Sequence, residues 1–232
     1  MHLHFIGFGP GDPELLTRKG HRLLAEADLI IYPGSIIAEE FLSEFSAEKV
    51  DSWGMHLEDI VDTIERAVQA GRSVVRLQSG DPSIYGAINE QIALLKDRGI
   101  ESDIVPGVSC VFASAAALGS ELTSLDPSLV VTRPAGKTLE KDNLLDFAHL
   151  PCTMAVLLGI DKVDHIAERV ASVRGPEEPC GVVYHASRDD QRVIVGTLGD
   201  IAARVREEGI DRTATLIIGK SIIGHQRSVL YG

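Results

Sequence analysis

The sequence predicts an α/β protein of two domains, the first with a mainly parallel sheet and the second with a mixed sheet. Two observations lead to this prediction. Short apolar runs typical of buried strands alternate with segments whose apolar residues recur at helical spacing. This alternation breaks at the polar, turn-rich residues 120–127. We therefore expect one domain at residues 1–120 and another at residues 121–232, with a ligand cleft between them.

The first domain is expected to form a mainly parallel sheet. Its apolar runs, each short enough for a strand, lie at residues 3–8, 29–32, 74–77 and 104–105. The first strand leads into a helix whose first turn carries Asp12 and Glu14. Further helices are expected from apolar spacing or from small residues that allow close packing, at residues 60–68, 84–95 and 113–119.

The second domain follows a different order of elements. Its strands are expected at residues 129–132, 154–158, 181–185, 191–195 and 215–219. Helices fit between them at residues 139–147, 163–173 and 198–207. The turn residues 187–190 join two of these strands, which predicts a hairpin and hence a mixed sheet.

Composition and charge exclude several classes of protein. The chain has 232 residues, 44% of them hydrophobic, and a formal net charge of −12, which argues against nucleic-acid binding. It has no apolar run long enough to span a membrane and no secretory leader, so we expect a cytoplasmic protein. Three cysteines without paired spacing indicate buried thiols in a reducing compartment. His2 and His4 are typical of a half-exposed strand end, and we expect no bound metal.

Two Gly-Asp-Pro turns, at residues 11–13 and 80–82, follow predicted strands and indicate a small-molecule site. Gly80 has no Cβ to block a ligand, and Asp81 shapes a turn that frees backbone donors. In open α/β sheets, ligands lie beyond the carboxyl ends of strands. A dinucleotide fingerprint fails because Asp12 stands at its third glycine. The loops suit a ligand without phosphates, neutral or positive, and S-adenosylmethionine (SAM) fits that description.

In order and spacing, four motifs resemble those of the tetrapyrrole (corrin/porphyrin) methylases. They are Gly7-x-Gly9-Pro10-Gly11-Asp12, Ser79-Gly80-Asp81-Pro82, Pro106-Gly107-Val108-Ser109 and Gln191-Arg192-Val193. The resemblance covers essentially the whole chain. It implies two α/β domains of the class III SAM methyltransferase type, with the cofactor bound in the cleft between them and released as S-adenosylhomocysteine.

Within that family the chain most resembles the precorrin-4 and cobalt-precorrin-4 C-11 methyltransferases of cobalamin biosynthesis. The motifs that carry this narrower resemblance are Tyr32-Pro33-Gly34-Ser35-Ile36-Ile37, Gly54-Met55-His56-Leu57-Glu58-Asp59 and Val131-Thr132-Arg133. Two departures from the family pattern are Pro33, in place of a small residue, and Lys137, where arginine is more usual. The resemblance implies methylation of a corrinoid tetrapyrrole by a homodimer. Alternatives are a C-17 or C-20 corrinoid methylase and a non-catalytic SAM-binding protein.

The resemblance also implies which residues bind each ligand. Those implied for the cofactor are Pro10, Ser79, Gly80, Asp81, Ile84, Ser109, Cys110, Leu158, Ala186, Ala214 and Thr215. Those implied for the substrate are Tyr32, Ser35, Met55, His56 and Arg133. Core packing is the competing interpretation for Leu158, Ala186, Ala214, Tyr32 and Met55. The sequence shows no pattern typical of a catalytic triad. Direct displacement at the sulfonium methyl needs no covalent enzyme intermediate, so we name no catalytic residue.

Overall fold

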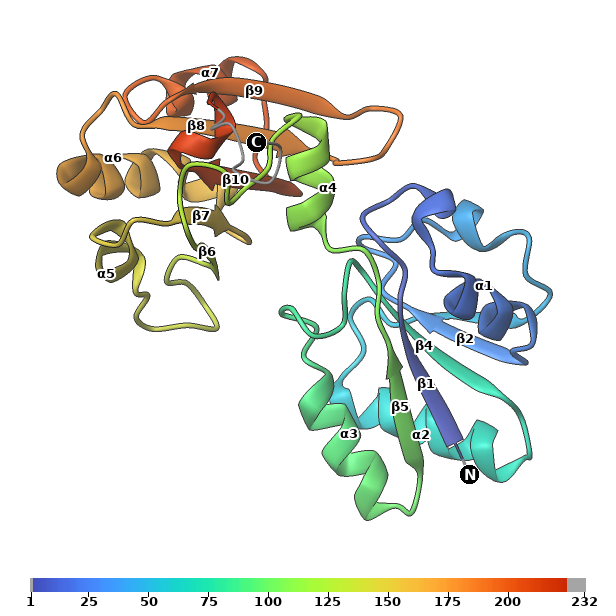
Figure 1. Cartoon of the computed structure of the whole chain (residues 1–232). Coiled ribbons are helices and arrows are strands. Elements are labelled where there is room, and N and C mark those ends of the chain that lie inside the picture. The colour runs from blue at the N-terminus through green and yellow to red at the C-terminus, as the bar shows by residue number, and fades with distance from the viewer. Residues whose placement is uncertain (1, 225–232) are drawn as a thin grey trace, which may run out of the picture. The chain divides into compact units, whose positions relative to one another are not determined.

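The computed structural model describes residues 2–224, and in this part of the chain the strands form two five-stranded sheets. Each sheet belongs to one of two compact units, which divide between Cys110 and Val111 (Figure 1). All strand pairs of the first sheet are parallel, whereas the second sheet contains both kinds of pair. The predicted fold class is therefore confirmed.

The first sheet has the strand order β3-β2-β4-β1-β5. Its strands are β1 (His2–Gly7), β2 (Leu29–Tyr32), β3 (Glu48–Asp51), β4 (Val74–Gln78) and β5 (Glu101–Val105). The edge strand β3 was not predicted from the sequence. Its four residues are Glu, Lys, Val and Asp, and an edge strand with such exposed side chains carries no apolar run.

Helices cover both faces of this sheet. The helix α1 (Arg18–Ala25) packs on one face through Leu24, beside Ile6, Ile30 and Leu77. The helices α2 (Leu57–Gln69) and α3 (Ile88–Asp97) pack on the other face. Because parallel strands are buried on both faces, β2 and β4 have no exposed residue.

Two helices in the first unit begin later than predicted. Residues Pro13–Leu15 form only a 3₁₀ turn, whose first N–H groups are capped by Asp12, and α1 begins later, after the N-cap residue Thr17. The helix predicted from residue 84 begins at Ile88. The helix begins later because Tyr85 and Ala87 adopt left-handed backbone conformations, which interrupt a right-handed helix.

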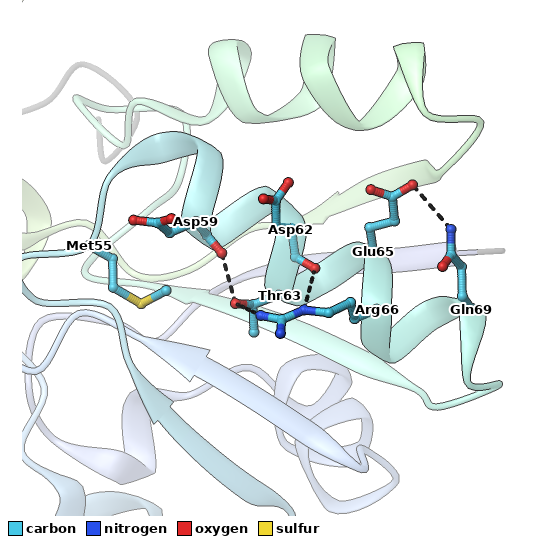
Figure 2. Close-up of a pocket in the computed structure, with 7 residues that line it drawn as sticks. All are labelled: Met55, Asp59, Asp62, Thr63, Glu65, Arg66 and Gln69. Carbon is cyan, nitrogen blue, oxygen red and sulfur yellow. Dashed lines mark hydrogen bonds between the residues drawn. The ribbon is translucent and has the colours of Figure 1, made fainter.

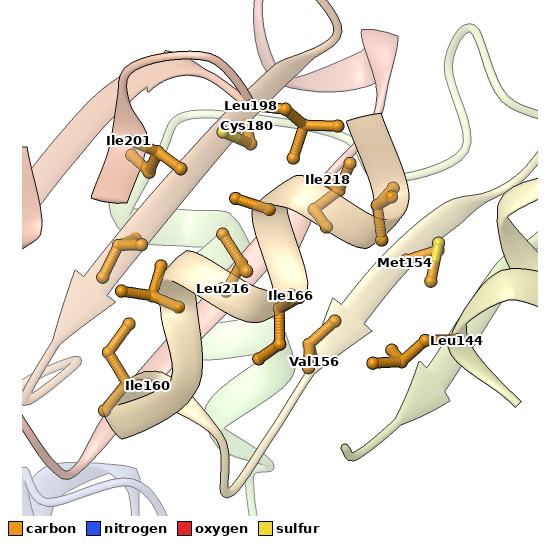
Figure 3. Packing of buried hydrophobic residues seen from close by; sticks show 14 of the residues in the cluster. Leu144, Met154, Val156, Ile160, Ile166, Cys180, Leu198, Ile201, Leu216 and Ile218 are labelled. Atoms are coloured by element: carbon orange, nitrogen blue, oxygen red, sulfur yellow. The ribbon is translucent and has the colours of Figure 1, made fainter. Parts of the chain in front are cut away.

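The second sheet has the strand order β6-β7-β10-β8-β9. Its strands are β6 (Leu129–Thr132), β7 (Thr153–Val156), β8 (Pro179–Tyr184), β9 (Arg192–Thr197) and β10 (Ala214–Ile218). The predicted hairpin is confirmed, since β8 and β9 pair antiparallel, whereas β6 and β7 pair parallel. The helices α5 (Leu144–Ala148), α6 (Val163–Arg174) and α7 (Ile201–Glu207) enclose one core cluster with this sheet (Figure 3).

The compact units divide before residues 120–127, where the sequence suggests a junction. Helix α4 (Cys110–Ala117) packs through small side chains on β8, where Ala113 meets Val183. Gly181 of β8 permits this approach, because a Cβ there would lie 2.7 Å from Leu118. Residues after α4 are also held within the second unit, since Ser221 Oγ accepts hydrogen bonds from the backbone at Leu125 and Asp126.

All three cysteines are free thiols. Cys152 and Cys180 are buried, as predicted, and burial raises the pKa of the Cys180 thiol to about 12. The prediction of a buried thiol is wrong for Cys110, which is partly exposed because it is the first residue of α4, where the two compact units divide. Within residues 2–224, no helix combines the length and the apolar character that crossing a membrane requires.

Candidate functional site

Three loops meet backbone to backbone beyond the carboxyl ends of β1, β4 and β5. The N–H of Gly9 donates to the carbonyl of Gly80 at 3.2 Å, and the N–H of Gly80 donates back to Gly9 at 2.8 Å. A Cβ on Gly7 would lie 2.6 Å from the Gly80 carbonyl oxygen, and one on Gly107 would lie 2.2 Å from the same oxygen. Only glycine fits at both positions, so the three loops meet through peptide groups and not through side chains.

The carboxylate of Asp81 joins two of these loops. Its Oδ2 accepts the N–H of Gly107 at 3.0 Å, and its Oδ1 accepts both the N–H of Ser83 at 2.9 Å and the Ser83 hydroxyl. Partial burial raises the pKa of Asp81, but these hydrogen bonds outweigh it and hold the pKa below the ordinary value. The carboxylate is thus an ionised clamp for the loops, which agrees with its predicted loop-shaping role.

Strained backbone occurs beside the Asp81 loop of the first unit and in one region of the second unit. In the described part of the chain, the non-glycine residues with positive φ, from 47° to 71°, are Tyr85, Ala87, Leu158, His185, Ser187 and Thr213. Each such conformation costs about 1–3 kcal/mol and persists where its surroundings enforce it, often at functional sites. Tyr85 and Ala87 follow the Asp81 loop, and the other four lie beside, or among, the cofactor residues implied for the second unit.

The remaining cofactor residues implied for the first unit lie on these loops. Pro10 follows Gly9 and is half-buried, while Ile84 lies in the turn after Asp81, where its N–H donates to the Asp81 carbonyl at 3.2 Å. Ser109 is buried, and Cys110 is partly exposed at the start of α4. The structure therefore brings together, around Gly80, residues that lie far apart in the sequence.

The cofactor residues implied for the second unit gather at one end of three adjacent strands. Ala214, at the start of β10, pairs with Tyr184 at the end of β8, and Thr215 pairs with Val183. Leu216 pairs with Val156 at the end of β7, which brings Leu158 to the same end of the sheet. Strand register alone thus collects Leu158, Ala186, Ala214 and Thr215.

These four residues differ in burial. Leu158 is 65% exposed in a left-handed conformation, so core packing does not explain this leucine. Ala186 and Thr215 are buried, and Ala186 belongs to the small cluster beneath α4. Ala214 is half-buried. Packing accounts for Ala186, whereas an exposed, strained leucine at a strand end indicates a contact surface.

A polar network that the sequence analysis missed supports the strained residue His185. Its Nδ1 lies 2.8 Å from Asp190 Oδ2, and its ring stacks on Tyr184 with 3.7 Å between the centroids. The hydrogen bond from His185 is the main cause that lowers the pKa of Asp190. The guanidinium of Arg192 lies over the Tyr184 ring, 4.6 Å from its centroid. This network holds the segment that carries Ala186.

Three of the implied substrate residues, Ser35, Met55 and His56, lie on two neighbouring loops of the first unit. Asp51, at the end of β3, joins these loops, because its Oδ1 accepts the N–H of Gly34 and the N–H of Trp53, both at 2.8 Å. Ser35 and His56 are exposed and Met55 is half-buried. Asp51 therefore fixes the segments that precede and follow it, and the sequence analysis missed this residue.

Tyr32 is buried in the apolar cluster that α1 covers, so packing accounts for its ring. Burial raises the pKa of its hydroxyl, and the carboxylates of Glu39 and Asp51 raise it further. Arg133 follows β6 in the second unit. Its guanidinium donates to the hydroxyl of Thr138 at 2.9 Å and to the Thr138 carbonyl at 3.2 Å, so its own loop orients it.

Two buried polar side chains of β4 were also missed, although both stand in an otherwise apolar strand. Arg76 is 5% exposed, donates to Gln91 and to the carbonyl of Ile31, and has its pKa lowered to about 10 by burial. Gln78 is 7% exposed and directly precedes the Ser79-Gly80-Asp81 loop. Among the described residues, its Nε2 has no hydrogen-bond partner, which is costly unless a ligand supplies one.

A groove of about 640 Å³ along α2 lies apart from these loops (Figure 2). Its lining is mostly polar. Within the helix, Arg66 donates to the Asp62 carbonyl and Gln69 to Glu65, and the carboxylates of Asp62 and Glu65 pair with Arg98 at the end of α3. Met55 alone of the implied substrate residues reaches it. We interpret the groove as a solvated helix face, because most of its polar side chains already have partners within the protein.

Comparisons with known proteins give a consistent result. The family model described as Tetrapyrrole (Corrin/Porphyrin) Methylases matches residues 2–202. The cobalt-precorrin-4 C(11)-methyltransferase of Methanocaldococcus jannaschii is 47% identical over 222 residues, which cover 93% of this chain and 86% of the relative.

Two solved structures share the fold. One is the X-ray structure of a cobalamin biosynthetic enzyme, a cobalt precorrin-4 methyltransferase, with a TM-score of 0.92, 36% identity and 96% coverage of both chains. The other is the uroporphyrin-III C-methyl transferase of Thermus thermophilus complexed with S-adenosyl homocysteine. It has a TM-score of 0.82, 31% identity and coverage of 96% of this chain and 94% of its own.

Proposed function

The chain belongs to the tetrapyrrole (corrin/porphyrin) methylase family, and from this we propose that it transfers a methyl group from SAM to C-11 of precorrin-4 or cobalt-precorrin-4. The product would be the corresponding C-11-methylated corrinoid of cobalamin biosynthesis. The observation that carries the proposal is the full-length similarity to a C(11)-methyltransferase together with the peptide-lined loops around Gly80.

The loops of the first unit fit SAM in chemical character. Gly80 has a φ of +63°, and a Cβ placed on it would meet only the backbone nitrogen of Cys110, at 3.9 Å. The face of Gly80 is therefore open to a ligand that approaches the backbone closely. The solved relative with bound S-adenosyl homocysteine supports the assignment of this class of ligand. In the second unit, exposed Leu158 offers apolar contact.

The chain's own residues act by binding and orientation. When bound, SAM supplies an electrophilic methyl group on a sulfonium sulfur, and the macrocycle supplies the carbon nucleophile. Asp81 keeps the loop after β4 fixed to Gly107, so the peptide groups that would hold the cofactor are pre-organised. Since both partners are intrinsically reactive, positioning and exclusion of water supply the acceleration, and no side chain is assigned as a base.

The substrate side rests on the loops that Asp51 joins. Ser35 and His56 offer exposed polar groups there, and Arg133 offers a guanidinium suited to a carboxylate of the macrocycle. The amide of Gln78 adds a buried donor next to the Asp81 loop, and we assign it to the ligand that occupies this loop. Ser35, His56 and Arg133 would orient the macrocycle rather than react with it.

The test is incubation of the full chain with enzymatically generated precorrin-4 and, separately, cobalt-precorrin-4, each with ¹³C-methyl-labelled SAM. Mass spectrometry should show the gain of one methyl group, and NMR should place the label on C-11. Confirmed SAM binding without transfer to either substrate would overturn the C-11 assignment. The other corrinoid intermediates would then be tested as substrates, and a lack of transfer to all of them would favour the non-catalytic alternative.

We also propose that the protein is a homodimer, which the family resemblance supports. The apolar segment at residues 36–45 is a weak candidate for the interface, because Ile37, Leu42 and Phe45 are buried in the core of the first unit. Light scattering coupled to size-exclusion chromatography tests the proposal, and a molar mass near 25.0 kDa would contradict it.

A further inference from the structure

Two histidines and one aspartate meet at the end of the first sheet opposite to the glycine loops. His2 and His4 lie at the start of β1, and Asp103 lies in the adjacent edge strand β5. His2 Nε2 is 3.2 Å from Asp103 Oδ1, and His4 Nδ1 contacts the same oxygen. The two imidazole centroids are 4.7 Å apart. The methyl-transfer site uses none of these residues.

The local structure explains why the three side chains meet. Successive side chains of a strand alternate between faces, so His2 and His4 share one face of β1 with Ile6. In the parallel pairing of β1 with β5, His4 is in register with Asp103. Ligating side chains thus continue a stripe that is apolar further along the strand. The sequence shows only the two histidines, because Asp103 is distant along the chain.

The geometry suits a metal ion. All three ligand atoms lie within 4.8 Å of one another, and in the described part of the chain this is the one group of three such residues. A tetrahedral ion with bonds of ~2.1 Å needs ligand atoms that are ~3.4 Å apart. The distance from His2 Nε2 to Asp103 Oδ1, 3.2 Å, is already close to that value. Two imidazoles and a carboxylate are a ligand set for divalent zinc, cobalt, nickel or copper.

We propose that His2, His4 and Asp103 bind a divalent transition-metal ion that links β1 to the edge strand β5. The occupied site has two imidazole nitrogens and Asp103 Oδ1 as protein ligands, with water in the open position. The ion replaces the hydrogen bonds that both histidines make to Asp103 when no metal is bound. Its role is structural, since it ties the first strand of the chain to an edge of the sheet.

Lys19 of α1 sets the strength of this site. Its Nζ lies 3.4 Å from Asp103 Oδ2, whereas both histidines contact Oδ1. The ammonium group orients the carboxylate, but its positive charge opposes a second cation nearby. Removal of that charge should therefore strengthen metal binding, an effect that a purely structural ion-pair network does not predict.

The experiment is titration of the untagged full chain at pH 8 with Co²⁺, followed by its visible absorption, and with Zn²⁺, followed by calorimetry. Protons compete with metal ions for imidazole and carboxylate ligands, and an alkaline buffer reduces this competition. The variants are His4→Ala, Asp103→Ala and Lys19→Met. His21→Ala is the matched control, because His21 also faces a carboxylate, Glu44 at 3.3 Å, but belongs to no group of three ligands.

We expect one ion per chain for the wild type and for His21→Ala, with tighter binding for Lys19→Met. His4→Ala and Asp103→Ala should weaken binding by at least about tenfold. Circular dichroism of metal-free samples shows whether each variant folds, and His2→Ala, at the more exposed ligand, serves if either of the others does not. Uptake of the ion that is unchanged by loss of these ligands, or absent from the wild type, would overturn the proposal.

Discussion

Substitution of Gly80 by alanine separates backbone strain from ligand contact, because the chain contains a matched glycine elsewhere. Gly80 and Gly99 both lie in the left-handed region, with φ values of +63° and +73°. A Cβ on Gly99 would meet nothing within 4 Å, and Gly99 ends the turn after α3, away from the glycine loops. Alanine at either position therefore introduces similar strain, whereas only Gly80 belongs to the proposed cofactor surface.

The expected magnitudes follow from this comparison. Left-handed backbone costs an alanine about 1–2 kcal/mol, so both variants should lose similar stability. For chains of this size, each kcal/mol corresponds to about 2–4 °C in the melting temperature. The new methyl group of Gly80→Ala also occupies space in which the cofactor would contact the backbone. We expect it to weaken S-adenosylhomocysteine binding at least about tenfold, which is 1.4 kcal/mol, while Gly99→Ala leaves binding unchanged.

The assay is isothermal titration with S-adenosylhomocysteine, with melting curves of both variants as the control for strain. Equal affinities for Gly80→Ala, Gly99→Ala and the wild type would refute the assignment of the Gly80 surface to the cofactor. Loss of affinity in both variants would mean that strain, rather than contact, governs binding.

Three further predictions concern individual polar side chains. Replacement of Gln78 by leucine should preserve or raise the melting temperature, since it removes a buried amide nitrogen without a partner, but should lower turnover of the corrinoid substrate or affinity for the cofactor. The pKa of Asp81 is lowered in the folded state, so its contribution to stability is present above the unfolded value near 3.8 and is lost as the pH falls through the folded pKa. The variant Asp81→Asn lacks this titrating group. In urea unfolding it should therefore lose less stability than the wild type between pH 7 and pH 3. In the second unit, Asp142 Oδ2 pairs with Arg169 at 3.0 Å and accepts the N–H of Ala135 at 2.7 Å. Asp142→Ala removes this buried acceptor and should destabilise the second unit by about 3 kcal/mol in the same assay. Asp146→Ala, at an exposed residue, should have little effect.

The predicted strands were mostly correct because buried strands are continuous apolar runs. The second sheet illustrates this, since its strands lie within two residues of the predicted ranges. The edge strand β3 was missed because an exposed edge has no apolar signal. Helix starts at residues 18, 88 and 144 came later than predicted. At residue 88 the cause is left-handed backbone at Tyr85 and Ala87, which no periodicity in the sequence reveals.

The candidate site was predictable where backbone dictates residue type. The glycines of the loops after β1 and β4 predict that peptide groups approach each other closely, and the structure shows that approach between Gly9 and Gly80. Long-range pairing was not predictable: nothing in the sequence links Asp81 to Gly107 or His4 to Asp103. Such contacts depend on strand order and register, which single-sequence patterns do not encode. The assignment of individual residues to cofactor or substrate stays a prediction.

The contact of Gly7 and Gly107 with the Gly80 carbonyl has a consequence for how this protein can change through mutation. At positions where peptide groups pack this closely, every substitution adds atoms, so chemically mild and drastic replacements should be equally deleterious. The proposed substrate loops, at residues 33–36 and 53–56, would instead contact the ligand through side chains, and there one side chain can be exchanged for a similar one. Selection could therefore alter which macrocycle is accepted in small steps, while the cofactor-binding half of the site allows almost none.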